Sequence, residues 1–92
     1  MRVELNDRAK KEFFKLDKAA QIQILKKLRF IESLDNPKDG GKPLAGNLLG
    51  LWRYRSGGYR ILAQILDDKL VILVVKILHK KMFINKVFYE KF

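Results

Sequence analysis

The stretch LWRYRSGGYRIL, residues 51–62, decides the fold of this 92-residue chain. Its two halves are rich in aromatic and branched side chains, and the Ser-Gly-Gly between them is typical of a tight β-hairpin turn. A two-residue turn at the glycines places Arg55 opposite Arg60. Because side chains alternate between the two faces of a strand, Arg53 then joins this pair on one face, and Trp52 lies on the other. A shift of one residue would scatter the arginines and expose the tryptophan, so the hydrophobic pattern favours the clustered register.

The residues before the hairpin predict a strand and two helices. Alternation predicts a short strand over residues 2–5. Asn6 can cap a first helix that begins at Asp7, and Asp17 can cap a second helix over residues 18–34. The apolar side chains at helical spacing, which we expect to face the core, are Ala9, Phe13, Leu16, Ile24, Leu25, Leu28, Ile31 and Leu34. Two helices joined so closely need a sheet to cover their apolar faces.

The remaining segments complete an α+β domain. Residues 36–47 contain two prolines and three glycines and predict a loop or turn with an extended exit. The near-continuous Val/Ile/Leu run over residues 70–78 is typical of a strand buried on both faces. The residues after it predict a short helix or a loose tail. We therefore expect one domain over residues 1–92: a short N-terminal strand, a two-helix hairpin, a three- to four-stranded antiparallel sheet, and a C-terminal helix or tail.

Charge is the strongest compositional feature. The formal net charge is +10, and residues 40–92 carry ten Lys and Arg against three Asp and Glu, while residues 1–39 carry ten against seven. A surplus of this size favours a polyanionic partner, either nucleic acid or an acidic protein. The alternative is a basic protein that stays soluble by self-repulsion.

Cysteine usage and hydropathy predict the compartment. The chain has no cysteine, which excludes disulfides and thiolate zinc sites and favours a reducing compartment. Its first residues lack the apolar core of a signal peptide. The longest apolar run, residues 70–75, is too short to span a bilayer. We expect a cytoplasmic protein with no membrane partner.

Three clustered arginines predict an anion site. Like charges opposite each other destabilise a sheet by a few tenths to roughly 1 kcal/mol, which a chain tolerates where an anion binds. Guanidinium groups pair with phosphate oxygens in a bidentate manner and stay charged at cellular pH. The alternative is that the arginines are solvated or pair with acids of the N-terminal helices. The remaining basic residues either contact a polyanionic partner or are solvated surface, among them Lys42, Lys81, Lys86 and the lysines of both helices.

The sequence resembles a known family. The stretch KPLAGNLLGLWRYRSGGYRIL, followed by an apolar strand and LHKK, is similar to the RelE/ParE toxin superfamily of bacterial toxin–antitoxin systems. The family pattern is a G-K-P-L-x-G loop, then L-W-R-x-R, a short turn, Y-R, and a strand that ends near G-H-R. The resemblance covers nearly the whole chain, because the leading strand and helix pair also fit the family.

The resemblance to the RelE branch implies a ribosome-dependent mRNA endonuclease that needs no metal and no cofactor. In such enzymes the 2′-hydroxyl attacks the adjacent phosphodiester and leaves a 2′,3′-cyclic phosphate. The family match implies that Arg53, Arg60 and Lys80 are the catalytic residues. Arg55 would bind backbone phosphate. His79, the single histidine, could act as a general acid or base or could orient and pack, and we place it among the substrate-binding residues.

Three positions depart from the family pattern. Leu51 stands where some RelE members carry a lysine, and Lys80 stands where an arginine is usual, so a bidentate phosphate contact is lost there. The family's C-terminal tyrosine aligns with Phe88, with Tyr89 one residue later, or with Ile84 at a shorter spacing. We expect Phe88 or Tyr89 to contact substrate, and with Phe88 in place stacking would survive without the hydroxyl.

The resemblance also implies partners and alternatives. A RelE-like toxin would bind a cognate antitoxin protein, the ribosome with its rRNA, and mRNA. A ParE-like toxin would instead inhibit DNA gyrase without any catalysis of its own. A third reading is a non-toxic binder of acidic protein or RNA.

Overall fold

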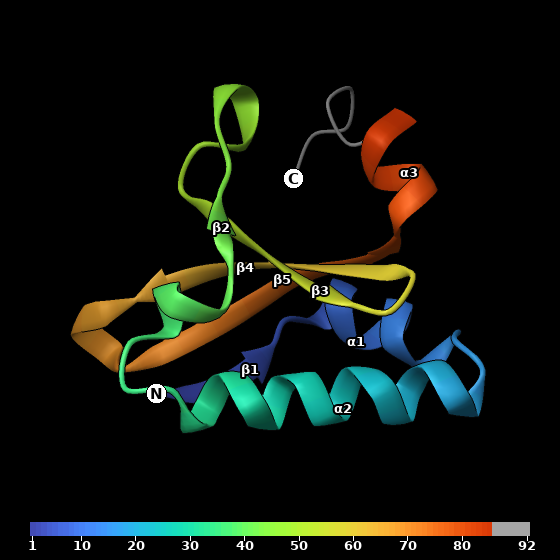
Figure 1. Cartoon of the computed structure of the whole chain (residues 1–92), viewed down its shortest axis with the longest axis horizontal. Coiled ribbons are helices and arrows are strands. Elements are labelled where there is room, and N and C mark those ends of the chain that lie inside the picture. The colour runs from blue at the N-terminus through green and yellow to red at the C-terminus, as the bar shows by residue number, and fades with distance from the viewer. Residues whose placement is uncertain (86–92) are drawn as a thin grey trace.

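The computed structural model describes residues 1–85 and has an α+β architecture. The elements follow in the order β1 (Arg2–Leu5), α1 (Asp7–Phe14), α2 (Lys18–Ser33), β2 (Lys42–Pro43), β3 (Leu51–Ser56), β4 (Tyr59–Leu66), β5 (Val71–His79) and α3 (Lys80–Asn85). One sheet has the strand order β1-β5-β4-β3-β2. Helices α1 and α2 lie on one side of it, whereas α3 and the segment around β2 rise from the other (Figure 1). The predicted fold class is confirmed.

Both predicted helix caps are confirmed. The Asn6 side chain accepts a hydrogen bond from Ala9 N at 2.8 Å, and the Asp17 side chain accepts one from Ala20 N at 2.8 Å. Each cap satisfies an N–H group that the first turn of a helix leaves without a partner. The two caps fix where α1 and α2 begin, and the cap at Asp17 lets α2 start shortly after α1 ends.

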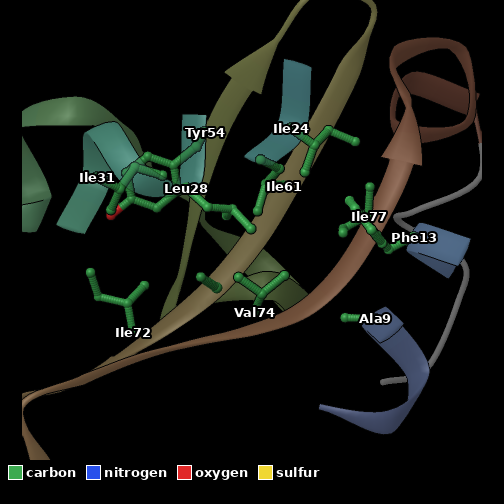
Figure 2. Packing of buried hydrophobic residues seen from close by; sticks show 11 residues of the cluster. Ala9, Phe13, Ile24, Leu28, Ile31, Tyr54, Ile61, Ile72, Val74 and Ile77 are labelled. Atoms are coloured by element: carbon green, nitrogen blue, oxygen red, sulfur yellow. The ribbon is translucent and has the colours of Figure 1, made fainter. Parts of the chain in front are cut away.

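The core lies between the helix pair and the sheet (Figure 2). Its buried side chains are Ala9, Phe13, Ile24, Leu28, Ile31, Tyr54, Ile61, Ala63, Ile72, Val74 and Ile77. Trp52 packs against this cluster, as predicted. Leu25 was expected to support the core, and that prediction is wrong, because its side chain is 43% exposed. The residue lies about 100° around the helix from Ile24, which puts it beyond the buried stripe.

The sheet differs in two respects from the expected antiparallel meander. Strand β1 pairs in parallel with β5, with Arg2 opposite Val71 and Leu5 opposite Val74. The short strand β2 extends the other edge by pairing with β3. As predicted, β5 is buried on both faces over most of its length. No helix within residues 1–85 is long and apolar enough to cross a membrane.

Helix α1 covers the edge of β5 that lies beyond the end of β1. The Oε1 atom of Glu12 accepts a hydrogen bond from Ile77 N at 2.9 Å, and its Oε2 atom lies 3.3 Å from Lys76 Nζ. The Lys76 side chain is only 6% exposed and that of Glu12 is 22% exposed. An exposed N–H at a strand edge can pair with another chain, so one carboxylate here satisfies the backbone and closes the edge.

A β-bulge at Val75 reverses the alternation of β5. Leu62 pairs with Lys76 and Ala63 with Val74, so Val75 is one extra residue on this strand. Val74 and Ile77 consequently both face the helices, although they are three residues apart. An inserted residue of this kind exchanges the faces of everything that follows it.

Tyr54 gives a test of the core. Its side chain is fully buried, and its hydroxyl donates a 2.7 Å hydrogen bond to Pro37 O. We expect Tyr54→Phe to lower the free energy of unfolding by about 1–2 kcal/mol, because the carbonyl would lose its partner. Urea unfolding at pH 7 measures this loss; an unchanged midpoint would contradict it.

The same hydroxyl predicts a pH dependence. Burial raises the pKa of Tyr54 from 10.0 to about 12. The unfolded chain therefore releases the phenolic proton at lower pH than the folded chain. The advantage of the parent over Tyr54→Phe should be complete below about pH 10 and should shrink as the pH rises toward 12.

Candidate functional site: a basic cluster on the open sheet face

The hairpin register brings three arginines together. Ser56 pairs with Tyr59, Arg55 with Arg60, and Arg53 with Leu62. Because cross-strand partners and alternate residues share a face, all three guanidinium side chains lie on the face that turns away from α1 and α2. The structure confirms the predicted register. We call Arg53, Arg55 and Arg60 the arginine cluster.

Arg60 lies near enough to Arg55 and Arg53 for their positive charges to act on it. Partial burial lowers the pKa of Arg60, and the positive charges of Arg55 and Arg53 lower it further. The Nη1 atom of Arg60 donates to Gly57 O at 3.1 Å and to Tyr59 O at 2.8 Å, which holds the group beside the turn. A bound anion would relieve the repulsion among these fixed cations. The arrangement is therefore suited to a phosphate group.

Lys42 is a member of this basic surface that sequence reasoning did not place. It pairs with Arg53 across β2 and β3, so the two side chains share the face that turns away from α1 and α2, which we call the open face. A strand of two residues has too few positions for alternation to show in the sequence. The loop prediction for residues 36–47 missed this strand for the same reason.

A small hollow lies at the outer edge of β3. It has a volume of about 290 Å³ and is lined by Lys27, Lys42, Arg53, Arg55, Asp39 and the Gly40–Gly41 backbone. A Cβ atom on Gly41 would lie 2.6 Å from Arg53 O and 2.8 Å from the Tyr54 ring. Only glycine therefore lets the backbone pass this close to β3, and the hollow has a backbone wall there.

Lys80 lies next to the hairpin turn, whereas His79 lies on the other face. Lys80 begins α3, is exposed, and donates its backbone N–H to Gly58 O at 2.8 Å. His79 pairs with Tyr59 and faces the helices, with the two rings edge to face at 5.5 Å. Its Nδ1 atom accepts a hydrogen bond from Lys81 N at 3.2 Å. These contacts fit the orienting and packing alternative for His79, and its role toward substrate stays a prediction.

The arginine cluster covers only part of the open face. A second apolar cluster of Leu48, Leu51, Leu62 and Leu78 occupies the rest of it, with Leu44 and Val75 packed alongside. The polar end of the face is thus the end near the hairpin turn. Phe88 and Tyr89, the predicted aromatic contacts, lie outside the described residues. Within residues 1–85, no group of three or more His, Asp or Glu side chains could hold a metal ion.

Fold and site together define a small basic α+β protein with three clustered arginines on an open sheet face. The family model described as "ParE toxin of type II toxin-antitoxin system, parDE" matches residues 3–83. The mRNA interferase toxin RelE of Escherichia coli K12 is 32% identical over 77 residues, which cover 82% of this chain and 78% of the relative. A putative RelE-like toxin protein of Escherichia coli is 36% identical over the same shares of both chains.

Solved structures agree with this result. A chain of the RelBE2 toxin–antitoxin complex from Mycobacterium tuberculosis superposes with a TM-score of 0.75 at 26% identity, covering 85% of this chain and 95% of that one. The chain described here belongs to the RelE/ParE toxin superfamily of type II toxin–antitoxin systems. Its curated relatives place it with the RelE family of these toxins.

Proposed function

We propose that the protein is a ribosome-dependent mRNA endonuclease that works without a metal ion. The observation that carries the proposal is the arginine cluster, with Arg60 held beside the turn and coupled electrostatically to its two neighbours. The relatives named mRNA interferase support the same reaction class. Residues 1–92 would act as one toxin domain in the cytoplasm.

The chemistry follows from fixed cations. The ribose 2′-oxygen attacks the adjacent phosphorus and loses its proton, the bond from phosphorus to the 5′-oxygen breaks, and that oxygen gains a proton. The products are a 2′,3′-cyclic phosphate and a 5′-hydroxyl. Negative charge grows on the phosphoryl oxygens in the transition state, where preorganised donors are most effective.

The residues divide this work. We assign Arg53 and Arg60 to the phosphoryl oxygens and to proton transfer, and the lowered pKa of Arg60 favours the latter role. Lys80, beside the turn, would supply a further positive charge, and Arg55 would bind the backbone. The ribosome would orient the message, so that few protein groups are needed. Phe88 or Tyr89 would stack on a base.

The test is to sequence mRNA 5′ ends after brief induction of the protein and in translating extracts. Cuts within codons that carry 5′-hydroxyl ends, and that depend on translation, are the expected result. Message that stays whole at saturating protein would contradict the proposal.

A second candidate function is inhibition of DNA gyrase, because the matching family model is described by its ParE toxin. The cluster would then contact protein. A supercoiling assay separates the two: inhibited gyrase together with intact mRNA would favour the ParE-like function.

We also propose a cognate antitoxin as partner, since several structural neighbours are toxin–antitoxin complexes. The net charge of +10 favours an acidic partner segment that associates quickly and in a salt-sensitive manner.

A further inference from the structure

The hollow at the edge of β3 joins charges from three separate elements. Lys27 comes from α2, Lys42 from β2, and Arg53 and Arg55 from β3, against the single carboxylate of Asp39. Four cations against one anion give the hollow a positive potential. Its size is that of a site for a small group.

The hollow is continuous with the arginine cluster, because Arg53 and Arg55 belong to both. The basic surface thus begins at Arg60 on β4, crosses β3 and reaches Lys42 on β2. Neighbouring strands lie about 4.8 Å apart, so this path is about 10 Å long at the backbone. It runs across the strands and then turns over the sheet edge.

Lys27 extends the path to the other side of the sheet. Its helix packs on the face opposite the arginines, yet Lys27 is among the residues that line the same hollow. Its ammonium lies over the Phe30 ring, 5.1 Å from the centroid, so a cation–π contact stabilises the charge. Nothing in the nuclease chemistry above uses this residue.

We propose that the hollow binds an RNA phosphate neighbouring the scissile one, so that the RNA strand crosses β4, β3 and β2 and leaves over the sheet edge toward α2. This rests on the proposed function, because it takes the arginine cluster as the place of the scissile phosphate. An acidic protein segment is the competing occupant. A hollow of about 290 Å³ that continues the cluster favours one sugar-phosphate unit of the same strand.

The test measures binding of purified protein to a 2′-O-methyl RNA hexanucleotide, which cannot be cut by 2′-hydroxyl attack. Lys27→Met removes the charge and keeps the aliphatic stem. We expect affinity to fall roughly fivefold at low salt, and the slope of log affinity against log salt to shrink by about 0.7, the value for one phosphate contact on a single strand. Lys27→Arg should restore both quantities.

Two controls separate a contact from a general loss of charge. Lys10→Met makes the same change of net charge on α1 at an exposed position and should leave the salt slope unchanged. A 2′-O-methyl dinucleotide has only one phosphodiester, which goes to the arginine cluster. Binding of this probe is followed by NMR titration. The ratio of the parent's affinity to that of Lys27→Met should then fall toward the ratio of the parent's affinity to that of Lys10→Met.

Several outcomes would overturn the proposal. Equal salt slopes for Lys27→Met and Lys10→Met would do so, as would a Lys27→Met defect of the same size on both RNA lengths. A Lys27→Met defect confined to a glutamate-rich peptide, with RNA binding intact, would assign the hollow to a protein partner.

The same experiments distinguish failure of the nuclease proposal from failure of the proposal about the hollow. Protein that shows the predicted RNA-binding pattern but leaves mRNA whole would remove the nuclease and keep the hollow. Protein that cuts mRNA while Lys27→Met binds every probe like the parent would do the opposite.

Discussion

Arg60→Ala is expected to slow mRNA cleavage at least about 10²–10³-fold, the usual effect of removing one donor to a developing oxyanion. The guanidinium is fixed by two carbonyl groups and is electrostatically coupled to two other arginines, so no neighbour can replace it without moving. The measurement is the rate at which cut message appears in a translating extract.

The fold should survive this substitution. Both hydrogen bonds of the Arg60 side chain go to nearby backbone, and its removal relieves repulsion from Arg55 and Arg53. Thermal unfolding of the purified variant checks this point. Arg29→Ala, which removes an exposed arginine of α2, is the matched control and should cut at the parental rate. Full activity of Arg60→Ala would remove the proposed mechanism.

Glu12→Ala is expected to give the largest loss of stability, about 2–3 kcal/mol. The change takes the acceptor from Ile77 N and an anionic partner from the buried Lys76 ammonium. A domain of this size has only about 5–15 kcal/mol to lose, and its melting temperature falls about 4–8 °C per kcal/mol. Calorimetry should therefore show a drop of roughly 10–20 °C.

Two variants keep this prediction specific. Glu4→Ala removes a carboxylate whose pair with Arg2 is largely solvent-exposed, and it should cost less than about 0.5 kcal/mol. Glu12→Gln retains an oxygen that can accept a hydrogen bond from Ile77 N. Its loss of stability should lie between those of Glu12→Ala and Glu4→Ala. If Glu12→Ala has the same melting temperature as Glu4→Ala, the Glu12 carboxylate does not stabilise the strand edge.

Local sequence was enough to predict the hairpin and both helices. The register of β3 and β4 followed from a period of two and a glycine turn, and it already grouped Arg53, Arg55 and Arg60. The caps at Asn6 and Asp17 followed from side chains that compete well for orphan N–H groups. These features depend on residues that are neighbours along the chain.

Two of the features that sequence reasoning missed join residues far apart in the chain, and a third depends on a strand too short to show a pattern. The parallel pairing of β1 with β5 links positions about seventy residues apart, and no local pattern reports it. The contact between Glu12 and Ile77 spans 65 positions, and Lys42 reaches Arg53 only through a strand of two residues. The predicted basic face was therefore correct near the turn and incomplete at the sheet edge.

The extra residue at Val75 decides which face of the sheet each later residue of β5 occupies. With an unbroken count from Val74, the imidazole of His79 would stand among the guanidinium groups and Leu78 would enter the helix-side core. An odd number of residues inserted or deleted within β5 would therefore exchange the faces of the residues that follow. Loss of the extra residue would exchange the faces of the residues after it and would place the imidazole of His79 beside the arginine cluster.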